Sequence, residues 1–269
     1  MRKLEKITIL IPCHNEEKGI GAVIDGVPLQ TLRRMGYKTE IIVINNNSID
    51  STTQIVKERG ATIVFEDKKG KGNALITGFK SISPDTKFVI MLDGDNTYKS
   101  KEIPRLIEPL MNDFCDCIIG SRLGGKINKN SLKFQNRVAN WIYTFLVRQL
   151  YHANTTDVLS GFFAWKKEAI DKLTPYLTAK GFEIEMEMIT KMVKLGFEIY
   201  SVPITYDHRV GKSKIDAVKD GIRILLMLVK NLLWSPKPKT PNLINSPYAI
   251  YSWSKGDSPH REVLDKLEQ

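Results

Sequence analysis

Short apolar runs alternate with longer amphipathic segments over residues 1–122, and this alternation restricts the possible folds more than any other feature of the chain. We predict strands at residues 7–12, 40–45, 61–66, 87–93 and 115–122, with helices at 15–27, 48–60, 72–82 and 100–111 between them. Strands that are apolar on both faces and are separated by helices form parallel sheets covered on both sides. The sequence therefore predicts an α/β fold around a mostly parallel sheet.

Polar residues follow each predicted strand at its carboxyl end. These clusters lie at residues 13–16, 45–47, 66–67, 93–95 and 121–122. The carboxyl ends of parallel strands share one edge of a sheet, and open α/β sheets bind their ligands along that edge. Because the clusters are more polar than connecting loops require, we expect a single binding site there.

Asp93 and Asp95 follow the apolar strand Phe88–Leu92 with one residue between them. Along an extended chain such side chains point the same way, so the two carboxylates repel each other unless a positive charge compensates them. Three interpretations are open: a solvated turn, a pair that shares one proton, or a site for a divalent cation. Mg²⁺ typically uses one or two carboxylates together with substrate phosphates, and the position at a strand end favours this third interpretation.

The stretch Lys69–Gly72 precedes a predicted helix and is rich in glycine and lysine. It does not fit the P-loop pattern, and Leu75 stands where a dinucleotide-binding loop requires its third glycine. Backbone N–H groups at a helix N-terminus nevertheless favour anions. The segment is therefore either an anion-binding turn or an ordinary surface turn.

The chain of 269 residues carries a net charge of +10, which favours an anionic partner over a role in solubility alone. The sequence contains no helix-turn-helix pattern and no basic motif interleaved with aromatic residues, so nucleic acid is not an expected partner. The three cysteines and four histidines have neither disulfide nor zinc spacing. No run approaches the ~20 apolar residues that span a bilayer, so we expect a cytoplasmic protein.

Two segments in the second half, residues 131–151 and 214–234, combine Lys and Arg with Trp and Leu. We predict an amphipathic helix for each. These are either interfacial helices at a membrane surface or ordinary helices that face the core. From Ser235 onward the chain is rich in Pro, Ser, Lys and Asn, and we expect residues 235–269 to form a loosely ordered tail.

A set of short segments resembles one enzyme family in its order and spacing. The segments are IPCHNEE, IIVINNNSIDST, GKGNALITGF, MLDGDNTY, IIGSR, SGFFAWKKEAI, GFEIEMEMITKMVKLGFEIYSVPITY and RVGKSK, and the resemblance covers residues 7 to about 230. The chain resembles the GT-A-fold inverting glycosyltransferases, and among them the polyprenyl-phosphate branch that includes dolichyl-phosphate mannose and glucose synthases. The resemblance implies a GT-A domain at 1–234 with a C-terminal amphipathic helix. Within it, residues 1–121 would form the nucleotide-sugar half and residues 122–234 the acceptor half.

The resemblance also implies the donor side of the site. Asp95 would be the principal ligand of Mg²⁺ or Mn²⁺, with Asp93 beside it next to the sugar and ribose. The implied nucleotide-sugar contacts are Pro12, Asn15, Glu16, Asn46, Lys71, Asp93, Gly94 and Asp95. The family often has Asp where this chain has Asn45 or Asn46. This difference favours a UDP-sugar, such as UDP-glucose or UDP-N-acetylglucosamine, over GDP-mannose.

On the acceptor side, the resemblance implies a cluster of cations that holds a lipid phosphate. Its members are Arg122, Arg137, Arg209, Lys212 and Lys214. Asp157 would orient the acceptor or these cations, so the residues with implied catalytic roles are Asp93, Asp95, Asp157 and Arg209. A phosphate monoester is already ionised at neutral pH, and it needs cations to hold it rather than a strong general base.

The predicted activity is the metal-dependent, inverting transfer of a sugar from a nucleotide-diphosphate sugar to dolichyl or another polyprenyl phosphate. The alternative is an enzyme of the same fold with a soluble, glycan or protein acceptor. A sugar-binding protein without activity would be expected to lose Asp93, Asp95 or the downstream basic residues, and all are present. We expect the protein to lie peripherally on the cytoplasmic face of a membrane, bound to the lipid surface or to a membrane-anchoring partner.

Overall fold

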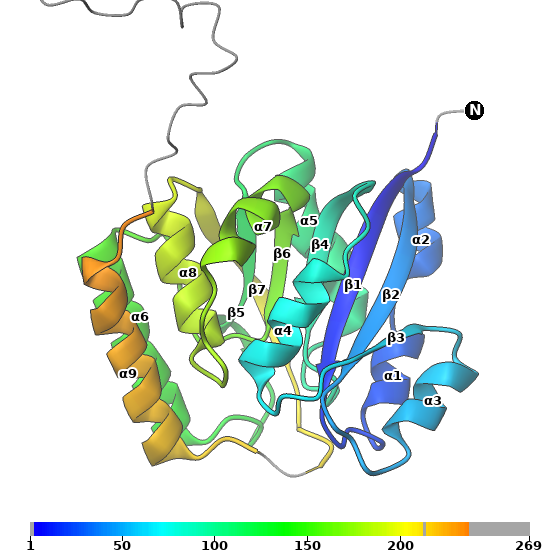
Figure 1. Cartoon of the computed structure of the whole chain (residues 1–269), viewed down its shortest axis with the longest axis horizontal. Coiled ribbons are helices and arrows are strands. Elements are labelled where there is room, and N and C mark those ends of the chain that lie inside the picture. The colour runs from blue at the N-terminus through cyan, green and yellow to red at the C-terminus, as the bar shows by residue number, and fades with distance from the viewer. Residues whose placement is uncertain (1–2, 212–213, 237–269) are drawn as a thin grey trace, which may run out of the picture. The chain divides into compact units, whose positions relative to one another are not determined.

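The computed structural model describes residues 3–211 and 214–236. Within these residues the strands form a seven-stranded sheet in the order β3-β2-β1-β4-β6-β5-β7 (Figure 1). The strands are β1 (Glu5–Cys13), β2 (Tyr37–Asn45), β3 (Thr62–Phe65), β4 (Thr86–Leu92), β5 (Cys117–Ile127), β6 (Phe162–Lys166) and β7 (Ile199–Tyr206). Strand β6 runs antiparallel to β4 and β5, and the other neighbouring strands pair in parallel. The predicted mostly parallel α/β sheet is confirmed.

Helices cover both faces of the sheet, as Figure 1 shows. One face carries α1 (Ile20–Asp25), α2 (Leu29–Arg34), α3 (Thr52–Glu58) and α5 (Ile103–Met111). The other face carries α4 (Lys71–Lys80), α7 (Lys167–Leu173) and α8 (Ile184–Lys194). Next to α8 stand α6 (Phe134–Tyr151) and α9 (Ala217–Leu233), which pack against each other. The predicted C-terminal amphipathic helix is therefore confirmed as α9.

Alternation along β4 decides which helices face the first aspartate of the predicted site. Phe88, Ile90 and Leu92 belong to the core beneath α1 and α5, whereas Val89 and Met91 belong to the core beneath α4 and α8. The next residue in this alternation is Asp93, so its side chain points toward the side of α4 and α8. A basic or acidic residue at the start of either helix can therefore reach it.

Part of the predicted sequence organisation lies outside the described residues. This applies to Lys212 and to residues 237–269, which make up most of the predicted tail. In the part of the chain that the structure describes, no helix is both long enough and apolar enough to cross a bilayer.

The glycine-rich turn before α4 is packed against another segment of the chain. The N–H groups of Gly72 and Asn73 donate to the carbonyl of Lys180 at 3.1 and 3.3 Å. A Cβ on residue 72 would lie 2.2 Å from the carbonyl oxygen of Ala179, so only glycine fits this approach. Because these backbone donors already have a partner, the anion-binding interpretation of this turn is not supported, and the glycine serves close packing.

We predict that Gly72→Ala lowers the free energy of unfolding by about 2 kcal/mol or more, because the new methyl group forces the 178–181 segment away from α4. Gly221→Ala is the matched control. Its Cβ would meet only the Tyr143 hydroxyl at 3.5 Å within helix α9, so it should stabilise the chain by about 0.5–1 kcal/mol. Urea denaturation of both variants measures the difference, and equal stability of Gly72→Ala and the parent chain would contradict the packing argument.

Candidate active site

The carboxylate of Asp93 is paired with a lysine that a second carboxylate shares. Lys71, the first residue of α4, places its Nζ 2.6 Å from Oδ1 of Asp93 and 2.6 Å from Oε1 of Glu185 in α8. Burial opposes the charge of Lys71, but the two carboxylates raise its pKa above the ordinary value. Lys71 therefore stays an ammonium ion and compensates part of the acidic charge at the end of β4.

Asp95 is compensated separately, by an arginine from the loop after β7. Its Oδ1 accepts hydrogen bonds from the N–H and hydroxyl of Thr97, and its Oδ2 lies 2.7 Å from Nη1 of Arg209. The premise that Asp93 and Asp95 lie on one extended strand does not hold. The extended strand ends at Leu92 and the chain turns at Gly94, so the alternation rule stops before Asp95.

The residues at this edge fit a hard divalent cation. Asp95 is 1% exposed, and its Oδ2 is held by the ion pair with Arg209 alone, so a cation could take this oxygen by displacing the guanidinium. Within residues 3–211 and 214–236 there is no cluster of three or more Asp, Glu, His or Cys able to hold a metal by itself. A cation here would take one or two carboxylates from the protein and complete its shell with phosphate oxygens and water.

The residues after β1 form a turn rather than the start of a helix. Asn15 has a φ of 53°, its side-chain oxygen accepts the N–H of Ile49, and α1 begins only at Ile20. This corrects the predicted helix at 15–27. Glu16 is half-buried and forms an ion pair with Lys214, whose ammonium also donates to the carbonyl of Asn15 at 3.2 Å. Burial raises the pKa of Glu16.

Lys214 therefore lies on the nucleotide side of the edge in this structure, beside Glu16 and not among the predicted acceptor cations. Pro12 is half-buried just before the same turn. Gly94 packs against β1, because a Cβ on it would lie 2.5 Å from Sγ of Cys13. These positions put Pro12, Gly94 and Lys214 within the predicted donor region.

Asn46 holds a loop together with its side chain. Its Nδ2 donates to the carbonyls of Glu66 and Lys68, each at 2.8 Å, and its Oδ1 accepts the N–H of Gly70 at 2.7 Å. The residue is buried, and a base or ribose contact by its side chain would require one of these bonds to be exchanged. Asn46 thus shapes the turn that leads into Lys71.

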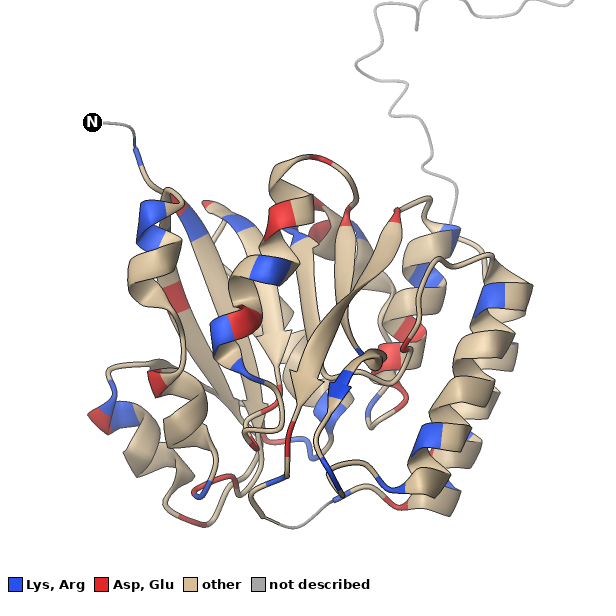
Figure 2. Cartoon of the chain, turned by 180° about the vertical axis from the view of Figure 1, so that it is seen from behind, with Lys and Arg blue, Asp and Glu red and all other residues tan. Residues whose placement is uncertain are grey.

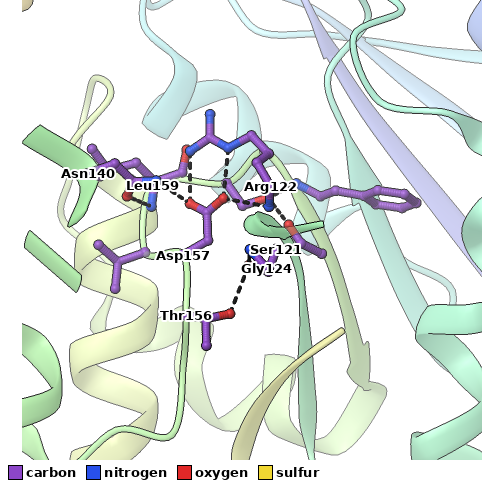
Figure 3. A network of polar contacts seen from close by, with 12 residues as sticks. Ser121, Arg122, Gly124, Asn140, Thr156, Asp157 and Leu159 are labelled. Atoms are coloured by element: carbon purple, nitrogen blue, oxygen red, sulfur yellow. Dashed lines mark hydrogen bonds and ion pairs between the residues drawn. The ribbon is translucent and has the colours of Figure 1, made fainter. Parts of the chain in front are cut away.

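Arg122 and Asp157 form the centre of a buried network (Figure 3). The backbone N–H and Nε of Arg122 both donate to Oδ2 of Asp157 at 2.8 Å, and its Nη2 donates to Oδ1 at 2.9 Å. Nη2 also donates to the carbonyl of Leu159, and Asn140 of α6 donates to Oδ1 of Asp157 at 2.7 Å. Asp157 therefore orients Arg122, which retains only Nη1 for a further partner among the described residues.

Arg137 differs from Arg122 in its surroundings. It is exposed in the first turn of α6, three residues before Asn140, so the two residues lie on neighbouring turns of one helix surface. The predicted acceptor cations are thus divided. Arg122 is fixed in the network, Arg137 lies exposed near it, and Arg209 is on Asp95.

Glu185 is not among the residues predicted from the sequence, although the sequence contains a signal for it. Residues 183, 185 and 187 are all Glu at the beginning of an otherwise Ile- and Met-rich helix. Side chains two positions apart on a helix point in nearly opposite directions, so these three cannot all face water. Glu185 and Glu187 are in fact buried.

Helices α6 and α9 present apolar side chains to solvent. Figure 2 shows both helices mostly in tan, with few charged segments. Residues 134–151 contain no acid, and the acid inside α9, Asp220, is buried. We call this surface the α6–α9 face; its exposed apolar members are Phe134, Val138, Trp141, Ile142, Phe145, Leu150, Val218, Ile222, Leu225, Leu226, Val229 and Leu233. Each helix also has a side that faces the core, as Val147 of α6 and Leu228 of α9 do, so each buries one apolar side and exposes another.

The chain is similar to archaeal glycosyltransferases of Haloferax volcanii. It is 29% identical to the low-salt glycan biosynthesis hexosyltransferase Agl6 over 92% of this chain, but it spans only 60% of the length of Agl6. It is 31% identical to the glycosyltransferase AglJ, covering 84% of this chain and 72% of AglJ. A dolichyl-phosphate hexose transferase of the same organism is 25% identical, with 84% of this chain and 93% of that protein covered.

A solved structure shares the fold. The complex of glucosyl-3-phosphoglycerate synthase from Mycobacterium tuberculosis with Mn²⁺, UDP and phosphoglyceric acid superposes with a TM-score of 0.66 at 20% identity. The match covers 87% of this chain and 80% of that one. This likeness shows that the sheet and its helices have the predicted GT-A arrangement. The model of glycosyl transferase family 2 matches residues 8–174, and on this evidence the chain belongs to glycosyl transferase family 2.

Proposed function

We propose that this chain is a metal-dependent, inverting glycosyltransferase. It moves a hexose or N-acetylhexosamine from a UDP-sugar, preferred over GDP-mannose, to dolichyl or another polyprenyl phosphate. The observation that carries the proposal is the buried Oδ2 of Asp95, an oxygen ligand at the carboxyl edge of the sheet whose charge is balanced by an exchangeable arginine. The similarity of the chain to the hexosyltransferase Agl6 and to a dolichyl-phosphate hexose transferase supports hexose transfer as the reaction.

On the donor side, Asp95 with Asp93 would hold Mg²⁺ or Mn²⁺, and the turn around Asn15 and Glu16 would receive the nucleoside. The ion, when bound, neutralises the negative charge of the diphosphate leaving group. The M. tuberculosis neighbour crystallised with Mn²⁺ and UDP supports this donor chemistry. Besides holding the ion and the nucleoside, these donor-side residues would orient the sugar for attack on its anomeric carbon.

On the acceptor side, a phosphate oxygen would attack the anomeric carbon opposite the diphosphate. The new carbon–oxygen bond forms as the bond to the diphosphate breaks, so UDP leaves and the configuration inverts. The attacking phosphate is already ionised, so its capture depends on basic residues rather than on a general base. Arg137 would be available, as would Nη1 of Arg122, which has no hydrogen-bond partner among the described residues, and Arg209 would join them once it leaves Asp95.

The α6–α9 face supports a lipid acceptor. Its apolar side chains are flanked by Arg137, Arg148, Lys219, Arg223 and Lys230, and no exposed acid interrupts either helix between residues 134 and 151 or 217 and 233. Apolar helix faces bordered by basic residues bind at the interface of anionic membranes. We propose that this face docks peripherally on the cytoplasmic surface of a membrane, where the polyprenyl phosphate is held. A membrane-anchoring protein is the other occupant to test.

A soluble phosphorylated acceptor is the second candidate function. The M. tuberculosis neighbour was crystallised with phosphoglyceric acid, which needs similar cations but no lipid surface. A screen of nucleotide sugars against polyprenyl phosphate in vesicles and against soluble phosphorylated acceptors separates the two functions. Release of UDP only with the soluble acceptors would overturn the lipid assignment.

For the metal site, we predict that Asp95→Asn abolishes sugar transfer while the protein stays folded. The retained Oδ1 still accepts both Thr97 hydrogen bonds, but the negative charge that would bind the cation is lost. In a thermal-shift experiment, Mn²⁺ with UDP should raise the Tm of the parent chain and of the exposed control Asp171→Asn, but not that of Asp95→Asn. Full turnover of the parent chain in excess chelator would remove the metal from the mechanism.

For the acceptor phosphate, we predict that Arg137→Ala lowers kcat/KM for polyprenyl phosphate about ten- to a hundredfold, the value of a charge-assisted hydrogen bond of about 1.5–3 kcal/mol. The KM for the nucleotide sugar should not change. Arg148→Ala is the matched control, because Arg148 is exposed on the same helix near its other end. A loss of donor affinity with unchanged acceptor saturation would move Arg137 to the donor side.

For the membrane surface, we predict that Trp141→Glu and Leu226→Glu each reduce binding to anionic vesicles about tenfold or more, since each removes an apolar side chain worth about 1.5–3 kcal/mol on burial and adds a negative charge. Ile49→Glu is the control, since Ile49 is 92% exposed on a distant loop. Co-sedimentation at low and high salt measures binding. A parent protein that remains in the supernatant at every salt concentration would contradict direct lipid binding.

A further inference from the structure

We propose that Glu185 is a positioning residue of the donor site: it draws the ammonium of Lys71 away from full pairing with Asp93 and so keeps Asp93 negative enough to attract the metal–diphosphate complex. The inference rests on the proposed function and deepens it. It assigns a role to a residue that neither the sequence motifs nor the similarity to known proteins singles out.

Only one glutamate at the start of α8 reaches the donor site. Both carboxylate oxygens of Glu187 accept hydrogen bonds, from Thr178, Ala179 and Lys191. These bonds fix residues 178–179, which precede the helix. Glu183 accepts two backbone N–H groups of that same segment. Glu185 instead contacts Lys71, the lysine that touches Asp93.

The distances show that the lysine is shared equally. Its Nζ is 2.6 Å from each carboxylate, and its side chain is only 12% exposed. The Glu185 side chain is 7% exposed, and burial raises its pKa above the ordinary value. Keeping a buried carboxylate charged is costly unless it is paired. A single carboxylate would already satisfy a structural need for a partner of Lys71, so the second one points to a functional charge balance.

The net charge of the three groups predicts how each substitution changes cation binding. With both carboxylates ionised, the charges of Asp93, Lys71 and Glu185 sum to −1, and the ammonium lies between the two acids. Without the charge of Glu185 the sum is zero, and Lys71 would pair with Asp93 alone. Without Lys71 the sum is −2. Cation binding beside Asp93 should follow this order, because the groups lie in a partly buried site where Coulomb interactions are screened less than in water.

The test is calorimetric titration of Mn²⁺ into the full chain with UDP present at saturation, which requires no catalytic turnover. Glu185→Gln should weaken Mn²⁺ binding about tenfold, the effect of about 1.4 kcal/mol from one charge in a partly screened site. Lys71→Met should leave Mn²⁺ binding as tight or make it tighter, although it loses a predicted nucleotide contact. The double variant Lys71→Met/Glu185→Gln restores the sum to −1 and should bind Mn²⁺ like the parent chain.

Two controls separate positioning from folding. Glu187→Gln, in the same helix, should lower the Tm but leave the Mn²⁺ affinity of the folded protein unchanged. Glu185→Asp keeps the charge and should restore Mn²⁺ affinity relative to Glu185→Gln. If Glu185→Gln does not fold, the comparison of the double variant with Lys71→Met still measures the charge of Glu185.

The outcomes distinguish this inference from the proposed function. Equal Mn²⁺ affinity of the parent chain and Glu185→Gln, or loss of affinity in both Glu185→Gln and Lys71→Met, overturns the role of Glu185 and leaves the metal site intact. A parent chain that binds no Mn²⁺ in the presence of UDP overturns the proposed metal dependence, and the role of Glu185 with it.

Discussion

Repulsion among four acidic side chains is the constraint on which the carboxyl edge of this sheet depends. Glu16, Asp93, Asp95 and Glu185 gather there, and each is held by a basic side chain from another segment. Lys71 comes from the beginning of α4, and Arg209 and Lys214 come from the loop after β7. The pairs Lys71–Glu185, Arg209–Asp95 and Lys214–Glu16 connect the predicted nucleotide half with the predicted acceptor half. Removing a charged side chain from one half therefore leaves its partner in the other half without a counter-charge.

The second half has its own buried centre. The pair of Arg122 and Asp157 joins the middle of β5, the second turn of α6 through Asn140 and the segment that leads into β6. Removing either partner would leave a buried charge uncompensated, which costs several kcal/mol. Arg122 therefore serves the architecture of the predicted acceptor side, which makes the exposed Arg137 the cleaner probe of the proposed phosphate binding.

Much of the fold was predictable because strands buried on both faces consist of continuous runs of apolar residues. The antiparallel direction of β6 has no comparable sequence pattern, since it depends on pairing with strands that are distant in the chain. The place of Asp93 and Asp95 followed from the end of β4. Their partners did not, because Lys71, Glu185 and Arg209 meet them only through tertiary structure. The stripe on α9 predicted an amphipathic helix, but it did not reveal that a second apolar side remains uncovered.

If the proposed cation binds Oδ2 of Asp95, the contact of this oxygen with Arg209 makes loading an exchange of one ligand for another. An ion that takes this oxygen must first displace a guanidinium group, so its apparent affinity is reduced by the strength of the pair it breaks. The displaced arginine is set free only when the ion has arrived. The freed guanidinium can then bind a second anion only after the cation and the diphosphate are in place. The order of binding therefore depends on one atom, Oδ2 of Asp95.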